Sequence, residues 1–245
     1  MSRSRVNLLL VLLALVPAPL MGQGPATQPA TQPADNAAMR KWLSDLASPD
    51  SSVRDAARAK MMTLTRDDLP ALQKLVEENR PLAPSQATAI RQIVQEVYLA
   101  GEPYQAEENK GFLGILMENS GAGMRDFDHG DVHGDPGVVV AERIPGFCAS
   151  RMLLDGDVIL GTTNPRLMFT DSSALQQAIQ AVLPGETIHL QVLRNGRVID
   201  VPLVLDPKPA EASIATISGF KLRRAAKFQE YWESTFAPLL REDVG

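Results

Sequence analysis

The chain has 245 residues, of which 44% are hydrophobic and 22% are charged, and its formal net charge is −5. This length allows one or two domains, and the hydrophobic content is that of a chain that buries a core, which excludes global disorder. The acidic balance gives no overall field that would attract nucleic acid, so nucleic acid is excluded as the expected partner.

The first residues have the order of a secretory signal peptide. Arg3 and Arg5 precede an apolar run at residues 6–16, and prolines and small residues follow it. The run is about half the length of a membrane span, which needs roughly 20 apolar residues. We predict a signal peptide at residues 1–22 and an exported protein, periplasmic or secreted, that begins between Gln23 and Pro25; an uncleaved anchor is the alternative.

Residues 23–36 form a Pro/Ala/Thr/Gln repeat that cannot bury a core, so a linker is expected there. Residues 37–101 then carry apolar residues at helical spacing, and this predicts four helices. The stretch Leu43–Ala57 resembles one HEAT-type repeat. Residues 69–98 lack its Val-Arg-x-Ala-Ala signature, and solenoids need three or more repeats, so a small four-helix, HEAT-like domain is expected.

The pattern changes to short β-branched runs between Lys110 and Asp206. Asn195-Gly196 predicts a type I′ hairpin, because both residues tolerate a positive φ. An apolar face over residues 172–183, stopped by Pro184-Gly185, predicts a helix. The runs predict strands at residues 113–118, 138–144, 157–160, 187–194 and 198–205.

Four local motifs occur in order within this region. They are Phe112-Leu113-Gly114-Ile115, then Gly137–Ala141 with Pro145–Ala149, then Leu154–Leu160 with its Gly-Asp-x-Ile-Leu segment, and last Pro184–Ile188 with Val192–Gly196. Together they resemble a PDZ domain of the circularly permuted arrangement of bacterial envelope proteases, over residues 108–206. The expected fold is α+β: a small four-helix domain, a PDZ-type β-barrel or sandwich of five to six strands with two helices, and a C-terminal amphipathic helix.

The resemblance implies a site for peptide C-termini. Successive amides in a tight turn bind a carboxylate by charge-assisted hydrogen bonds, and Gly114 lets the backbone approach closely. The amides of Leu113, Gly114 and Ile115 would hold the carboxylate, and residues 115–119 would pair with the peptide as an added strand. A bulky residue at position 114 is expected to abolish binding while the fold survives. The candidate groove residues are Lys110, Phe112, Leu116, Met117, Leu175 and Ile179.

An apolar C-terminal residue of the ligand would enter a pocket with walls from Leu113, Ile115, Leu175 and Ile179, although all four fit a core role equally well. Lys110 would either attract the carboxylate at long range or lie in solvent. No His or Arg stands at the start of the helix at Ser172-Ser173, so a hydroxyl-specific ligand is not implied.

The remaining candidates for chemistry are few. Cys148 is the single cysteine, so no internal disulfide forms, and a small buried residue is expected there. No serine lies in a Gly-x-Ser-x-Gly context. The segment at residues 124–137 could gather ligands around a cation or be a long loop, and we assign it no metal and the chain no cofactor. Its candidate ligands are Asp126, Asp128, His129, Asp131, His133 and Asp135.

Residues 207–245 predict a C-terminal tail whose helix presents Leu222, Ala225, Phe228, Trp232 and Phe236 on one face. This face is expected to pack on the helical domain or the outer PDZ surface, with contact to a partner or a membrane as the alternative.

The sequence therefore predicts a protein that is not an enzyme: an exported, non-catalytic adaptor that captures peptide C-termini or extended strands. The alternative is a structural or assembly protein whose PDZ fold no longer binds ligand, which a groove filled by the chain's own tail would favour. A metal-dependent hydrolase that uses the Asp/His loop ranks last.

Overall fold

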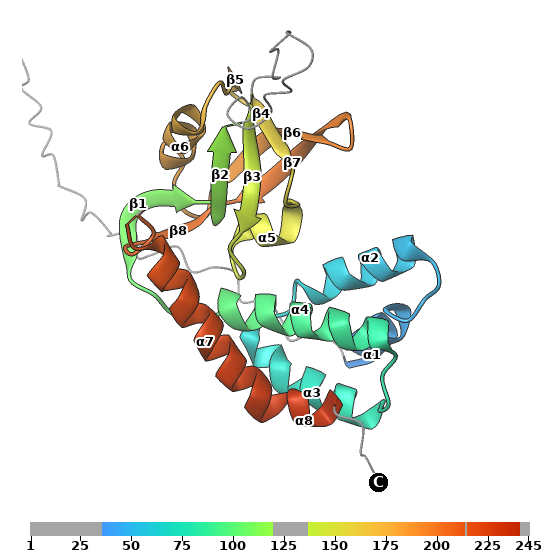
Figure 1. The fold of residues 1–245 in the computed structure, drawn as a ribbon. Helices are drawn as coiled ribbons and strands as arrows, with labels where there is room; N and C mark the ends of the chain where they lie inside the picture. Colours follow the sequence, from blue (N-terminus) through green and yellow to red (C-terminus); the bar gives the residue numbers. More distant parts are fainter. Residues whose placement is uncertain (1–35, 120–136, 214, 241–245) are drawn as a thin grey trace, which may run out of the picture. The chain divides into compact units, whose positions relative to one another are not determined.

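The computed structural model of the chain describes residues 36–119, 137–213 and 215–240 (Figure 1). The predicted signal peptide, almost all of the linker and the candidate cation loop lie outside the described residues.

The four predicted helices of the N-terminal part are confirmed. The Asp50 side chain accepts a hydrogen bond from the Ser52 N–H and caps the second helix, and Pro84 opens the fourth, where its missing N–H costs nothing. The helices are α1 (Asn36–Asp45), α2 (Ser51–Met61), α3 (Leu69–Glu78) and α4 (Pro84–Ala100), with a 3₁₀ turn at Arg66–Asp68 before α3.

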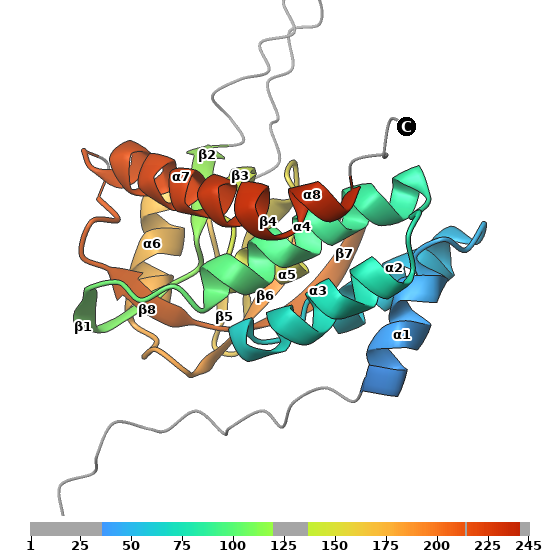
Figure 2. The same ribbon diagram turned by 90° about the horizontal axis from the view of Figure 1, so that it is seen from below.

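The tail helix packs on these four helices, as predicted. Figure 2 shows α7 (Ile217–Thr235) and the short α8 (Ala237–Leu240) along α4, and Phe228, Trp232 and Phe236 share a buried cluster with α1–α4. The predicted face is wrong at its start, because Leu222 is 72% exposed and Ala225 is also exposed. The buried residues of α7 instead recur at a spacing of four and include an arginine; they are Phe220, Arg224, Phe228 and Trp232.

The middle of the chain is an antiparallel sheet, so the α+β class is confirmed. The strand order is β2-β3-β4-β6-β7, and β5 pairs with β4. Asn195 and Gly196 have φ angles of 51° and 73°, which confirms the type I′ hairpin between the last two strands. The strands are β2 (Ile115–Asn119), β3 (Val138–Arg143), β4 (Val158–Thr163), β5 (Arg166–Met168), β6 (Thr187–Arg194) and β7 (Arg197–Val204).

Two further strands, β1 (Ala106–Phe112) and β8 (Asp206–Pro209), form a separate antiparallel pair that the sequence did not predict. They bracket the PDZ-like segment at both ends. Two short helices, α5 (Cys148–Met152) and α6 (Ser172–Gln180), complete this part.

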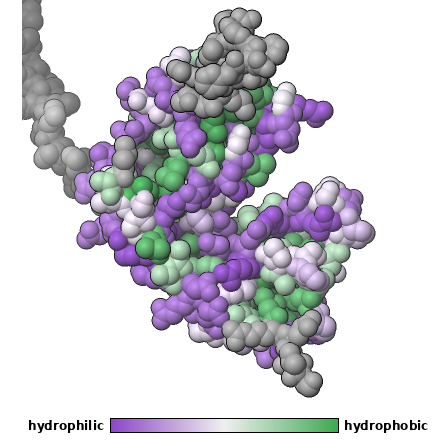
Figure 3. Space-filling view, viewed as in Figure 1, coloured by the Kyte–Doolittle hydropathy of each residue, from purple (hydrophilic) through white to green (hydrophobic). Residues whose placement is uncertain are grey.

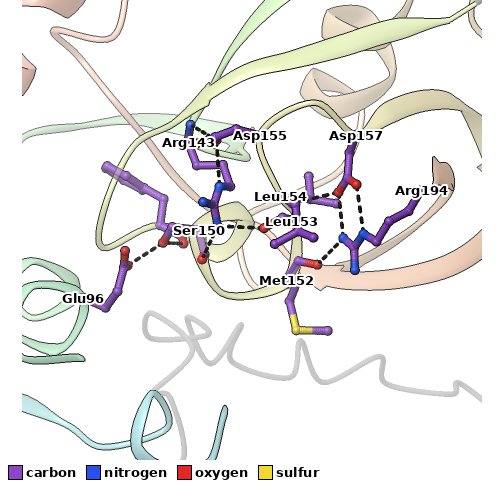
Figure 4. Close-up of polar contacts among 10 residues, drawn as sticks. Glu96, Arg143, Ser150, Met152, Leu153, Leu154, Asp155, Asp157 and Arg194 are labelled. Atoms are coloured by element: carbon purple, nitrogen blue, oxygen red, sulfur yellow. Dashed lines mark hydrogen bonds and ion pairs between the residues drawn. The ribbon is translucent and has the colours of Figure 1, made fainter. Parts of the chain in front are cut away.

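A buried ion pair joins two of the four motifs. Asp157 of the Gly-Asp segment has a side chain only 2% exposed, and its carboxylate accepts hydrogen bonds from Arg194 Nε at 2.9 Å and Nη2 at 2.6 Å (Figure 4). The same carboxylate accepts the Leu154 N–H at 2.8 Å. Hydrogen bonding to Asp157 raises the pKa of Arg194. The two motifs therefore meet in the fold, where one supplies the carboxylate and the other the guanidinium.

Candidate functional site

The strand β2 lies at the edge of the sheet and, among the described strands, pairs only with β3. Ile115 stands opposite Arg143, and the Ile144 N–H donates to the Gly114 carbonyl at 2.7 Å beside this pair. This bond marks a non-hydrogen-bonded pair, so the main-chain groups of Ile115 face away from β3. The register shift between β2 and β3 leaves its extra residue on β3, so β2 itself alternates regularly. The main-chain N–H and C=O of Met117 therefore face away from β3, like those of Ile115.

The loop before β2 contains a residue with a positive φ. Gly114 has a φ of +77°, a conformation that occurs in turns whose successive N–H groups can bind an anion. Within the described residues, the N–H groups of Leu113 and Gly114 donate no hydrogen bond. The carbonyl of Leu113 is held by the Ala149 N–H at 3.1 Å. The loop thus has its carbonyls bound and two of its amides available.

The predicted pocket walls are core residues in this structure. Leu113, Ile115, Leu175 and Ile179 are 0–8% exposed and belong to one buried cluster. Half-buried side chains of β2, of α6 and of the segment just after α6 pack against that cluster, and β2 and α6 are in contact with each other. These surface residues are Met117, Ala174, Ala178 and Val182. The four predicted wall residues therefore lie beneath this surface and do not form the sides of a pocket. In Figure 3 hydrophobic residues lie between hydrophilic ones over the part of the molecule that contains the sheet.

Sequence reasoning missed the two alanines of α6. Ala174 and Ala178 stand one helical turn apart, and small side chains at that spacing on a helix beside an edge strand leave room for another chain. The signal was present for Ala178, which lies on the apolar face of the predicted helix.

The other predicted groove residues are placed elsewhere. Phe112 packs edge-to-face on Phe147, with ring centroids 5.0 Å apart, in a separate aromatic cluster. Leu116 alternates with Ile115 and Met117 and so points to the opposite face of β2. Lys110 lies on β1, where its Nζ pairs with the Glu107 carboxylate at 2.5 Å.

A side-chain hydrogen bond joins β2 to α6. The Asn119 side-chain oxygen accepts a hydrogen bond from the Ser172 N–H at 2.8 Å and ties the last residue of β2 to the first of α6. The Asp171 side chain caps α6 through the Ala174 N–H at 3.0 Å. The strand β2 is therefore flanked by the amide loop at its start and by this hydrogen bond to α6 at its end.

Cys148 is half-buried behind the loop. Its N–H donates to Asp206 Oδ2 at 2.6 Å, and its Sγ lies 3.6 Å from the Leu113 carbonyl oxygen. Burial, and then the Asp206 carboxylate, raise the pKa of the thiol to about 12. Burial also raises the pKa of Asp206. The residue has the structural role that the sequence predicts.

Alkylation of Cys148 by iodoacetamide at pH 8 is expected to be about 100-fold slower or more in the native protein than in the unfolded chain, because only the thiolate reacts and an ordinary thiol has a pKa near 8.5. Mass spectrometry over time measures the rate, and the protein in guanidinium chloride is the control. Equal rates in the two states would contradict the buried placement.

Other polar groups form no recognised catalytic arrangement among the described residues. His189 Nδ1 lies 2.9 Å from Asp200 Oδ2, and the Thr163 hydroxyl donates to the other oxygen of this aspartate at 3.1 Å. Between residues 36 and 240, with the undescribed segments left out, no three His, Cys, Asp or Glu side chains gather to hold a metal. The candidate ligands of the cation loop, at residues 126–135, belong to one of the undescribed segments. None of the described helices is long and apolar enough to cross a membrane.

Comparison with known proteins finds likeness in solved structures. No protein-family model matches the sequence, and no curated protein matches it. The HtrA-type protease AlgW with a decapeptide matches at 24% identity and a TM-score of 0.34, over 50% of this chain and 35% of that one. The same protease with a tripeptide matches at 26% identity and 0.35, over 42% and 33%. A serine endoprotease from Yersinia pestis matches at 24% identity and 0.31, over 40% and 29%.

The chain thus spans about a third of the length of these proteins. The assignment of a PDZ-type fold to the middle of the chain rests on the strand order, the amide loop before an edge strand and the placement of α6 described above. The HEAT-like interpretation of the helical part has no support.

The prediction that the chain is not an enzyme is contradicted by the same comparisons, because the structures that it matches come from serine proteases of the HtrA type.

Proposed function

We propose that this protein is exported and binds the C-terminal residues of peptides in the groove between β2 and α6. One observation carries the proposal: the open edge of β2 continues into a loop whose amides at Leu113 and Gly114 have no acceptor among the described residues. An extended peptide can add to such an edge, and a terminal carboxylate can bind such amides. The peptides bound to AlgW are in keeping with this kind of ligand.

The groove also defines the ligand. A peptide that runs antiparallel to β2 would place its carboxylate at the loop Leu113–Ile115 and its last side chain over the apolar floor, so an apolar C-terminal residue is expected. The hydrogen bond between Asn119 and Ser172 joins the end of the five-residue strand to α6. Contact is therefore expected with about the last four residues, at about 3.4 Å per residue.

The position of the tail supports an open groove. The described part of the C-terminal tail packs through Phe228, Trp232 and Phe236 into the cluster of the four N-terminal helices. It does not lie on α6 or β2. This arrangement favours ligand binding over a structural protein whose groove is filled by its own tail.

A peptide library with free C-termini, screened against the mature chain, tests the proposal. The selected peptide is expected to bind more weakly by about 1.5–3 kcal/mol when its C-terminus is amidated, which is the typical contribution of hydrogen bonds to a charged group. Fluorescence anisotropy measures both affinities. Equal affinity for the free and amidated forms would refute recognition of the C-terminus.

The groove itself is located by a matched pair of variants in the same experiment. Ala178→Leu places a larger side chain between α6 and β2 and is expected to weaken binding, whereas Gln177→Leu places it on the exposed face of the same helix and is not. Equal affinity of the two variants would show that the peptide binds elsewhere.

A further inference from the structure

The segment at residues 144–150, which runs from the end of β3 into the first turn of α5, holds the carbonyl groups of the amide loop. The Ile144 N–H donates to the Gly114 carbonyl at 2.7 Å, and the Ala149 N–H donates to the Leu113 carbonyl at 3.1 Å. A carbonyl and the N–H of the next residue belong to one planar trans unit and point in opposite directions. The two bonds therefore also set the directions of the N–H groups of Gly114 and Ile115, which are two of the proposed carboxylate donors.

A carboxylate from the helical part holds this segment. Glu96, near the end of α4, is 9% exposed, and its Oε2 accepts a hydrogen bond from the Gly146 N–H at 2.8 Å. The same oxygen accepts the Ser150 hydroxyl at 2.5 Å (Figure 4). Both donors are about 50 residues away in the sequence. Charge-assisted hydrogen bonds of this kind are strong and directional when they are shielded from water. Burial raises the pKa of Glu96, although its hydrogen-bond donors and then Arg151 and Arg143 oppose the shift.

Arg224 of α7 provides a second contact to the segment. Its Nη2 donates to the Pro145 carbonyl at 3.2 Å and to the Leu99 carbonyl at 2.7 Å. Its guanidinium also lies over the Phe147 ring, 4.9 Å from the centroid. The helical part and the tail thus both contact the segment that orients the loop.

We propose that Glu96 is a positioning residue for the carboxylate-binding loop, so that the helical part takes part in peptide recognition without contacting the peptide. The inference rests on the proposed function. Without Glu96, the turn at Gly146 and the helix start at Ser150 lose their shared acceptor. The peptide units at 113–114 and 114–115 then lose part of the support that aims their N–H groups at the ligand.

Three variants of the full mature chain test this role: Glu96→Ala, which removes the acceptor, Glu96→Gln, which retains an acceptor oxygen, and Val97→Ala. The last change truncates the next residue of α4, which is 1% exposed and belongs to the helical cluster, and so controls for loss of packing alone. Each variant is measured against the selected peptide with a free C-terminus and against its amide.

We expect Glu96→Ala to reduce the ratio of the two affinities about tenfold, close to the loss of one hydrogen bond to a charged group. Glu96→Gln is expected to restore most of the ratio, and Val97→Ala to leave it unchanged. If the wild type discriminates and Glu96→Ala discriminates equally well, the positioning role is wrong. If the wild type does not discriminate, the proposed function fails instead.

If the wild type does not discriminate, the role of Glu96 can still be tested by NMR without a ligand. The amide chemical shifts of Gly114 and Ile115 are expected to move in Glu96→Ala and to stay in place in Val97→Ala, because only the first change releases the segment behind them. Unchanged shifts at both amides in a folded Glu96→Ala protein would overturn the inference independently of any peptide.

Discussion

Replacing Arg194 by methionine is expected to lower the free energy of unfolding by about 3–5 kcal/mol, the range found when one partner of a buried ion pair is removed. The reason is the depth of the partner that remains. The Asp157 side chain is 2% exposed, whereas that of Arg194 is 24% exposed. Without the guanidinium, the carboxylate would keep only the Leu154 N–H as a described donor. Urea denaturation followed by circular dichroism measures the loss.

The neighbouring pair provides a matched control. Arg143 Nε lies 2.8 Å from Asp155 Oδ1, but the Asp155 side chain is 55% exposed, so Asp155→Ala is expected to cost below about 1 kcal/mol. Asp157→Ala should cost less than Arg194→Met, because the guanidinium that it leaves can turn toward water. An Arg194→Met protein as stable as Asp155→Ala would show that the Asp157 pair does not stabilise the fold.

This ion pair also indicates how much of the fold was readable in the sequence. The Gly-Asp and Arg-x-Gly motifs could each be located, and so could the strand Thr187–Arg194 and the Asn195-Gly196 turn, because local backbone chemistry specifies them. The contact between Asp157 and Arg194 is part of the tertiary structure. The sequence spacing of the two motifs does not reveal it, so the ion pair that links them could not be predicted.

The missed elements lack a hydrophobic period. β1 reads Ala-Glu-Glu-Asn-Lys-Gly-Phe and is mostly exposed, and β8 contains two prolines, so neither shows the alternation of a strand. The face of α7 was misplaced for a related reason. A buried Arg224 stands between Phe220 and Phe228, and a pattern read from apolar residues alone moves the stripe to the exposed Leu222.

For the candidate site, the sequence predicted the backbone elements better than the positions of the side chains. The loop and the strand after it follow from a short motif, and the structure places β2 next to β3 and leaves the Leu113 and Gly114 N–H groups without an acceptor among the described residues. The side chains depend on packing. Leu175 and Ile179 fit groove and core equally well in the sequence, and only the three-dimensional contacts place them beneath the surface formed by Ala174 and Ala178.

Gly114→Ala is expected to destabilise the protein by about 2–5 kcal/mol. A positive φ of +77° costs a residue with a Cβ about 1–2 kcal/mol. A Cβ at this position would also lie 2.3 Å from the Cβ of Phe147, and relieving such overpacking typically costs about 1–3 kcal/mol. The sequence-based expectation that the fold survives a bulky residue here is therefore corrected, because the close neighbour of Gly114 is the protein's own aromatic cluster.

Gly185→Ala separates the two contributions. Gly185 has a φ of +84°, but a Cβ there would meet no atom within 4 Å, so this variant is expected to lose only the backbone share of about 1–2 kcal/mol. Chemical denaturation of both variants gives the difference, which measures the contact with Phe147. If Gly114→Ala lost no more than Gly185→Ala, Phe147 would be free to move away from the loop. If Gly114→Ala loses more stability than Gly185→Ala, as expected, then a Gly114 variant can fail to bind peptide simply because Phe147 is displaced. Amidation of the peptide is therefore the better test of carboxylate binding by the amide loop.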